Sequence, residues 1–224
     1  MSSSRPGDGD VLPEPPVDIN LRQLPLIRRA AESRYARIHR AADEPVWFGR
    51  DRATGVFRPP INRFDAPDRS YGVLYAAVTR DGAFAEAIGR KPRTFRSDTE
   101  LAELVITTLM LARDLRLVDL HGGEAIGALG ATGVVGVGPH SLARRWSKVL
   151  HEHPDRPDGV EYRCRHNSDE LAVALFHRIG DESLTPAGTV SLVSDLGWLV
   201  NHRGGMSKVR WRILNKRDPR PILT

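Results

Sequence analysis

Cysteine is nearly absent from this chain of 224 residues, which contains only Cys164. One cysteine excludes an intrachain disulfide and the repeated cysteine pairs of many structural zinc sites. No apolar run approaches the roughly 20 residues that a membrane-spanning helix needs, and the first residues lack the apolar core of a secretory signal. We therefore expect a cytoplasmic protein with no membrane attachment.

Aromatic residues are also scarce, at 6% of the chain, and they are scattered. A protein that binds single-stranded nucleic acid by stacking bases needs several interleaved aromatic side chains. The formal net charge of +5 attracts polyanions such as nucleic acid, nucleotides or acidic proteins, but charge alone does not choose among them. We therefore expect no direct binding to nucleic acid.

What the chain does have is an ordinary apolar content of 40%, enough for a sizeable core. Residues 1–17 are rich in Ser, Gly, Asp and Pro and offer almost nothing to bury, so we expect a disordered tail there. Residues 18–224 are expected to form one domain.

An arginine-rich segment follows the tail. Its apolar residues recur at roughly helical spacing, which predicts a helix beginning near Pro25. These residues are Leu21, Leu24, Ile27, Ala31, Tyr35 and Ile38. We interpret the basic face of this helix as solvated, with docking of a partner as the alternative.

Two further segments predict helices, residues 79–90 and 139–153. In the first, the apolar side chains form one stripe with Glu86 at its edge, and Gly89 is expected to end the helix. In the second, Ser141 is expected to cap the N-terminus.

Runs rich in Val, Ile, Leu and aromatic residues predict strands. They lie at residues 71–78, 104–109, 116–120, 158–167, 171–179, 189–193 and 207–214, and a helix is the alternative for residues 171–179. Strands and helices mix without a regular βαβ period. The sequence therefore predicts an α+β domain and not a doubly wound α/β fold.

The glycine-rich residues 122–138 are expected to form a loop with a short helix. They contain neither the GKS or GKT of a phosphate loop nor a GxGxxG turn between a clear strand and helix. The HEH triplet at 151–153 lacks the HExxH spacing of a zinc site. We interpret it as surface polar residues at a helix end and expect no structural metal.

Between residues 61 and 88, a polar loop carries Arg63, a strand carries Tyr75 and a helix carries Glu86. A guanidinium can bind a pyrophosphate with paired hydrogen bonds. An aromatic ring can stack on nicotinamide or adenine, and a carboxylate can stabilise an oxocarbenium-like sugar when a glycosidic bond breaks. Cleavage of NAD between nicotinamide and ribose requires these three groups. Each also has an ordinary interpretation: a surface ion pair, core packing and a solvated carboxylate.

Cys164 and His166 lie two apart on a predicted strand and would face the same side. A thiol nucleophile also needs an activated thiolate and a third, orienting group, which the sequence does not show. We favour a small thiol that is buried or lines a pocket.

The set "INRFDAP", "YGVLYAA" and "AFAEAI", with "DGVEYRCRHN" downstream, resembles the RES domain family, which is named for its Arg, Glu and Ser. The resemblance covers about residues 38 to 176. It implies an ADP-ribosyltransferase-like fold of mixed sheets with flanking helices, which binds NAD as a substrate and needs no cofactor.

The same resemblance implies roles for individual residues. Arg63 would hold the NAD phosphates, Tyr75 would line the nicotinamide-ribose pocket and Glu86 would be the catalytic carboxylate. The position of the family's serine carries Cys164. A thiol is a weaker hydrogen-bond donor than a hydroxyl, so this substitution bears on how well ribose or phosphate is oriented.

Many members of the family are toxins of bacterial toxin–antitoxin pairs that deplete NAD by hydrolysis or phosphorolysis. The resemblance thus implies a small helix-turn-helix antitoxin as partner, and a homodimer is the other association considered. Two alternatives to NAD cleavage stay open. They are ADP-ribosyl transfer to a protein, and a catalytically weak nucleotide-binding or interaction module.

Overall fold

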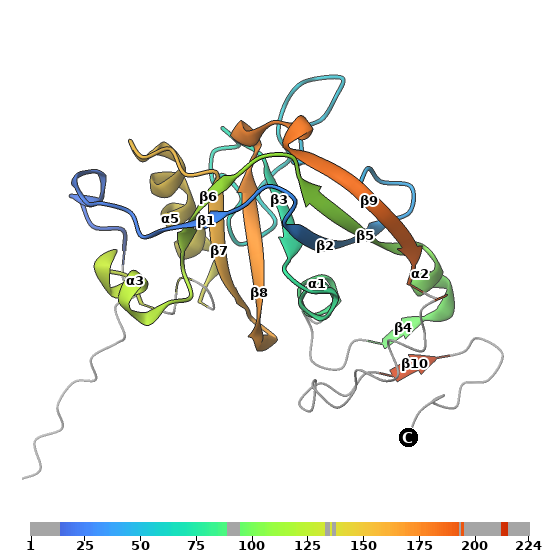
Figure 1. The fold of residues 1–224 in the computed structure, drawn as a ribbon. Helices are drawn as coiled ribbons and strands as arrows, with labels where there is room; N and C mark the ends of the chain where they lie inside the picture. Colours follow the sequence, from blue (N-terminus) through green and yellow to red (C-terminus); the bar gives the residue numbers. More distant parts are fainter. Residues whose placement is uncertain are drawn as a thin grey trace, which may run out of the picture.

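The computed structural model describes residues 14–88, 95–132, 135, 138–192, 194 and 212–214. Its centre is a mixed sheet of eight strands in the order β1-β6-β7-β8-β3-β2-β5-β9 (Figure 1). These strands are β1 (Leu26–Arg29), β2 (Arg34–Arg40), β3 (Val73–Ala77), β5 (Leu104–Leu111), β6 (Leu115–Asp119), β7 (Gly159–Cys164), β8 (Asn167–Phe176) and β9 (Leu184–Ser191). A separate parallel pair joins β4 (Phe95–Ser97) to β10 (Arg212–Leu214).

The α-helices that accompany the sheet in the described residues are α1 (Arg80–Ala87), α2 (Asp98–Ala102), α3 (Gly123–Ala128) and α5 (His140–Glu152). Short 3₁₀ turns occupy Ile19–Leu21, His177–Ile179 and Asp181–Ser183. Neighbouring strands of the large sheet are antiparallel except β6 and β7, which run parallel and are connected through α3 and α5. The expected single α+β domain with a mixed sheet and flanking helices is confirmed.

The core lies on both faces of the sheet because side chains alternate along each strand. In β3, Val73 and Ala77 join the cluster that includes buried residues of α1 and α5, whereas Leu74 and Ala76 join a second cluster on the other face. Helix α5 turns one apolar stripe inward, and its central Trp146 is fully buried. Strand β3 thus separates the two halves of the core and places its middle residue, Tyr75, toward the helices.

The predicted helix near Pro25 is wrong. Residues 26–29 and 34–40 form β1 and β2, separated by a turn in which Glu32 adopts a left-handed φ of 67°. Strand β1 pairs with β6, and β2 pairs with β5 along seven residues. Pairing with strands distant in sequence overrides the local helical spacing, which an alternating strand can match by coincidence.

Helix α5 begins without the cap expected at Ser141. Its N-cap is Pro139, no side chain caps it, and Ser141 already lies inside the helix. The remaining predicted elements in the described residues are confirmed in type, with β9 beginning five residues before residue 189. Gly89 and residues 207–211 of the last predicted strand lie outside the described residues, as do residues 1–13 of the expected tail.

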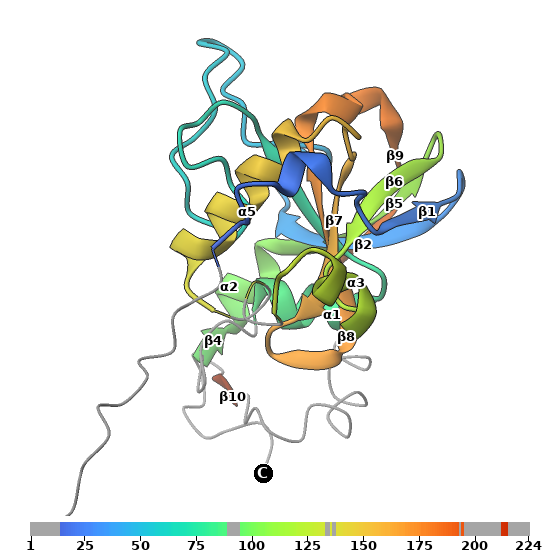
Figure 2. The ribbon, with the colours of Figure 1, turned by 90° about the vertical axis from the view of Figure 1, so that its left-hand side faces the viewer.

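Within the HEH triplet, Glu152 is exposed as expected, whereas His151 is half-buried and His153 is buried. The ring of His151 stacks on Tyr71 with centroids 3.8 Å apart. His153 is buried, and its Nε2 lies 3.1 Å from the carbonyl oxygens of Ile19 and Arg22. His153 thereby ties the N-terminal segment to the end of α5. Figure 2 shows this segment running beside the helix. None of the helices in the described residues is long and apolar enough to cross a membrane.

Candidate active site

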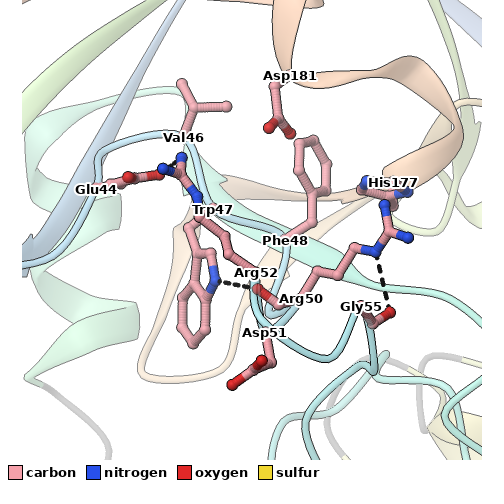
Figure 3. A pocket seen from close by; sticks show the side chains of 10 residues that line it. All are labelled: Glu44, Val46, Trp47, Phe48, Arg50, Asp51, Arg52, Gly55, His177 and Asp181. Atoms are coloured by element: carbon pink, nitrogen blue, oxygen red, sulfur yellow. Dashed lines mark hydrogen bonds and ion pairs between the residues drawn. The ribbon is translucent and has the colours of Figure 1, made fainter.

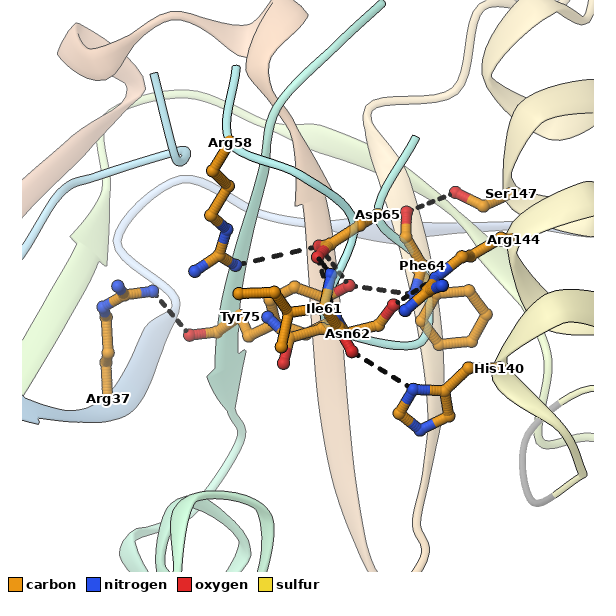
Figure 4. Close-up of polar contacts among 10 residues, drawn as sticks. All are labelled: Arg37, Arg58, Ile61, Asn62, Phe64, Asp65, Tyr75, His140, Arg144 and Ser147. Atoms are coloured by element: carbon orange, nitrogen blue, oxygen red, sulfur yellow. Dashed lines mark hydrogen bonds and ion pairs between the residues drawn. The ribbon is translucent and has the colours of Figure 1, made fainter. Parts of the chain in front are cut away.

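The loop that carries Arg63 is buried over residues 62–66, which is unusual for a polar connection. Asp65 organises it, because its Oδ2 accepts hydrogen bonds from the main-chain N–H groups of Ile61 at 2.9 Å and Asn62 at 2.7 Å. Asp65 also lies 3.8 Å from the guanidinium of Arg58. The buried carboxylate is thus satisfied and holds the loop in a single turn (Figure 4).

Tyr75 ties this loop to the sheet. Its hydroxyl donates to Asp65 Oδ1 at 3.0 Å and accepts from the N–H of Phe64 at 2.9 Å. Burial and the neighbouring Asp65 raise the pKa of this phenol well above its ordinary value. The neutral hydroxyl therefore serves the loop, and the ring is the part of Tyr75 that a ligand would meet.

Helix α5 holds the same loop from the other side. Arg144 Nε donates to the carbonyl of Asn62 at 2.9 Å, and Ser147 Oγ donates to the carbonyl of Phe64 at 2.7 Å. His140 Nδ1 lies 3.3 Å from the carbonyl of Ile61. Figure 4 shows these three side chains reaching the loop from α5.

Arg63 itself is 7% exposed. Its Nη1 donates to the carbonyl of Gly138 at 2.6 Å, just before α5. Burial lowers the pKa of its guanidinium, and the neighbouring charge of Arg165 acts in the same direction, whereas Tyr162, Glu86 and Tyr75 oppose the shift. Arg63 stays a cation, since a guanidinium remains protonated well above neutral pH.

Glu86 lies in the last turn of α1, which Thr79 caps by accepting a hydrogen bond from the N–H of Gly82. The carboxylate of Glu86 is half-buried and contacts β7 and the residue after it. Tyr162 Oη donates to Oε2 at 3.2 Å, and the main-chain N–H of Arg165 donates to Oε1 at 3.2 Å. Both carboxylate oxygens are therefore oriented by the β7 side of the site.

Cys164 lies beneath α1, with 1% of its surface exposed. Its Sγ is 3.8 Å from the carbonyl oxygen of Gly82. Burial, and then the negative charges of Glu86 and Glu170, raise the pKa of the thiol far above its ordinary value. A thiol held in its protonated form is a poor nucleophile, so this geometry favours a packing or orienting role.

The structure therefore brings together the residues singled out in the sequence. Tyr75 and Glu86 both act on the pKa of Arg63, and Cys164 lies against the helix that carries Glu86. A fixed cation can bind an anionic substrate, and a fixed carboxylate can stabilise a developing positive charge. Among the residues that the structure describes, no group of His, Cys, Asp or Glu is arranged to hold a metal ion.

Sequence reasoning missed Tyr162, Arg165 and Arg37. Tyr162 lies two residues before Cys164 on one strand, so the alternation of side chains could have placed it on the same face. Arg37 was assigned to a helix, yet its Nη1 donates to the carbonyl of Tyr75 at 3.0 Å from β2. Burial, with Arg58 nearby, lowers the pKa of Arg37 to about 10.

A separate pocket of about 280 Å³ lies between the segment 44–55 and the turns after β8 (Figure 3). Trp47, Phe48 and His177 supply its aromatic lining, and charged side chains of both signs surround them. None of the candidate residues described above lines it. Its size alone therefore does not make it the reactive centre.

A known fold matches this arrangement. The chain is similar to a solved structure, the crystal structure of the M. tuberculosis MbcT–MbcA toxin–antitoxin complex. The TM-score is 0.54 at 15% sequence identity, and the match covers 81% of this chain and 92% of that chain. At this identity the likeness shows a shared fold.

The family follows from the sequence comparison. The chain belongs to the RES domain family, whose model matches residues 29–195. It is also 30% identical over 92 residues to the protein named "Probable toxin y4kH" of Sinorhizobium fredii (strain NBRC 101917 / NGR234). That match covers 41% of this chain and 72% of the relative.

Proposed function

We propose that this protein cleaves NAD at the bond between nicotinamide and ribose, by hydrolysis or phosphorolysis. The observation that carries the proposal is that Arg63 and Glu86 are each held by hydrogen bonds within a RES domain, and that Tyr162 links the loop of Arg63 to Glu86. A glycosidic bond that breaks with an oxocarbenium-like transition state needs such a fixed carboxylate.

Arg63 binds the pyrophosphate in this proposal. A guanidinium has five N–H donors, and the hydrogen bond from Arg63 to Gly138 uses Nη1. The ring of Tyr75 faces the nicotinamide-ribose unit, since its hydroxyl is bonded to Asp65 and Phe64. Cys164 supports the pocket from beneath α1 and does not attack the substrate.

In the reaction, the electron pair of the C1′–N bond moves onto the pyridinium nitrogen, and neutral nicotinamide leaves. Glu86 stabilises the positive charge that develops on the ribose. An oxygen of water or phosphate then forms the new bond to C1′. When water attacks, its proton is lost to solvent, and the product is ADP-ribose. Preorganised electrostatics of this kind is typically the largest contribution to catalysis.

The biological role in this proposal is that of a toxin neutralised by a partner protein in the cytoplasm. It is supported by the relative named a probable toxin and by the fold neighbour solved in a toxin–antitoxin complex. A small helix-turn-helix antitoxin is the partner we propose. This support comes from similarity to other proteins, so the NAD cleavage assay is the first test of the proposal.

The assay incubates purified protein with NAD and no macromolecular acceptor, with and without inorganic phosphate, and separates the products chromatographically. Release of nicotinamide with ADP-ribose supports hydrolysis, and a phosphorylated ADP-ribose formed only with phosphate supports phosphorolysis. A second reaction contains adenine-labelled NAD and an added acceptor protein. Label on that protein, without free ADP-ribose, would instead indicate ADP-ribosyl transfer. Binding of NAD with no product would reduce the protein to a nucleotide-binding module.

A further inference from the structure

Tyr162 has a position that packing alone does not explain. It is 2% exposed, and its hydroxyl donates to Glu86 Oε2 at 3.2 Å. The main-chain N–H of Arg165 occupies the other carboxylate oxygen at the same distance. Together the two donors define the plane of the carboxylate.

The ring of Tyr162 also contacts the Arg63 loop. It packs against Phe64 with centroids 4.8 Å apart. Phe64 adjoins Arg63 in sequence, and its main chain is held by Tyr75 and Ser147. One side chain therefore touches both halves of the candidate site, the loop with the guanidinium and the helix with the carboxylate.

The chemistry of the phenol suits this position. Burial, and then the negative charge of Glu86, raise the pKa of Tyr162 well above its ordinary value, so the hydroxyl keeps its proton and remains a donor. A neutral donor orients a carboxylate without cancelling its charge. A glutamate side chain has three rotatable bonds, and a reacting group must be held close to its productive geometry.

We infer that Tyr162 is a positioning residue, whose hydroxyl holds the Glu86 carboxylate in a single orientation toward the substrate. The contact stands on the geometry alone, while its effect on turnover rests on the proposed NAD cleavage. Tyr162 does not itself donate or accept a proton in the reaction.

Tyr162→Phe tests this assignment because it keeps the ring against Phe64 and removes only the hydroxyl. Tyr35→Phe is the matched control. Tyr35 is 3% exposed and belongs to the core cluster on the other face of the sheet. Within the described part of the chain its hydroxyl has no hydrogen-bond partner.

With NAD as substrate, we expect kcat of Tyr162→Phe to fall about 10- to 100-fold, the loss of one hydrogen bond to a charged group, while KM stays unchanged. Tyr35→Phe should keep both constants. In a Glu86→Gln background, Tyr162→Phe should have no further effect, because the two residues act as a unit. Equal kcat in both tyrosine variants, each confirmed to be folded by thermal unfolding, would overturn the assignment.

A second measurement needs no NAD. The three-bond NMR couplings that report χ1 of Glu86 should show one rotamer in the wild type and in Tyr35→Phe, and averaging in Tyr162→Phe. Unchanged couplings in Tyr162→Phe would show that the hydroxyl does not hold Glu86. A wild-type protein that releases no nicotinamide would refute the proposed function, whereas the couplings would still decide the role of Tyr162.

Discussion

Two carboxylates lie on opposite faces of strand β7, and they are held in different ways. One belongs to the strand itself, and the other belongs to α1. Glu161 belongs to the strand, is fully buried and forms an ion pair with Arg29, whose Nε lies 2.7 Å from Oε2. His121 Nε2 lies 2.9 Å from its Oε1. Glu86 lies across the strand on α1, is half-buried, and accepts hydrogen bonds from the hydroxyl of Tyr162 and a main-chain N–H.

Under the proposed function, this difference separates a structural carboxylate from a reactive one. A charge that is completely buried must be paired, and the partner's opposite charge then largely cancels its field. The carboxylate of Glu86 is only half-buried and is oriented by a hydroxyl and a main-chain N–H, so it is not enclosed as that of Glu161 is. The comparison therefore predicts that changes at Glu161 affect mainly stability and that changes at Glu86 affect mainly turnover.

The largest expected effect is that of Glu86→Gln. The amide keeps the shape of the side chain and removes the charge that stabilises the ribosyl cation. We expect turnover of NAD to fall on the order of 10²–10³-fold with the melting temperature nearly unchanged, measured by nicotinamide release and thermal unfolding. Wild-type turnover in the folded variant would remove Glu86 from the mechanism.

Glu161→Gln should have the reverse profile. Breaking a buried ion pair costs several kcal/mol, but the side chain of Arg29 is 33% exposed and can turn to water. We expect the free energy of unfolding to fall by about 2 kcal/mol, measured by urea denaturation, with kcat kept. Glu124→Gln, on an exposed position of α3, is the control that should change neither. A loss of kcat at Glu161 without a loss of stability would break the comparison.

Arg63→Lys sharpens the comparison on the binding side. Lysine keeps the charge but loses the planar fork that binds a pyrophosphate with paired hydrogen bonds. We expect the dissociation constant for NAD to rise about tenfold, measured by calorimetry with a Glu86→Gln background to prevent turnover. Arg34→Lys, at an exposed position of β2, should bind NAD like the wild type. Equal affinity for Arg63→Lys would assign Arg63 to loop structure alone.

Cys164 should matter least for turnover. The thiol is buried beside the carbonyl of Gly82, so serine supplies a stronger donor without added bulk. We expect Cys164→Ser to keep or raise kcat and Cys164→Ala to remain partly active at saturating NAD. A thiol nucleophile would make both variants nearly inactive, and near-complete loss in Cys164→Ser would point to covalent chemistry.

The smallest expected effect concerns the pH dependence of stability and involves neither glutamate. Burial, with Arg178 and Arg156 nearby, lowers the pKa of His151 to about 4. Between the ordinary value near 6.5 and this value the unfolded chain binds more protons, so stability is full above this window and falls as pH falls through it. His151→Phe keeps a ring against Tyr71 and should reduce the drop in melting temperature between about pH 7 and about pH 5. An identical drop would show that other groups cause it.

Much of the fold could be predicted from local pattern. The apolar run around Tyr75 is a strand, the segment with Glu86 is helix α1 (Arg80–Ala87), and the amphipathic segment His140–Glu152 is α5. The predictions for these segments are correct because the side of an element that is buried follows from the periodicity of apolar residues along the chain. Arg63 and Glu86 could be named from their chemical types and from the resemblance to the RES domain family, which are also local features of the sequence.

Only the tertiary structure decided the rest. The residues after Pro25 are strands because they pair with β5 and β6, far along the chain. The packing of α1 on β7 buries Cys164 beside the carbonyl of Gly82. The same packing brings the hydroxyl of Tyr162 within hydrogen-bonding distance of Glu86. The sequence by itself determined which residues could react. Which of them face one another depends on contacts between distant segments, and local periodicity carries no information about those contacts.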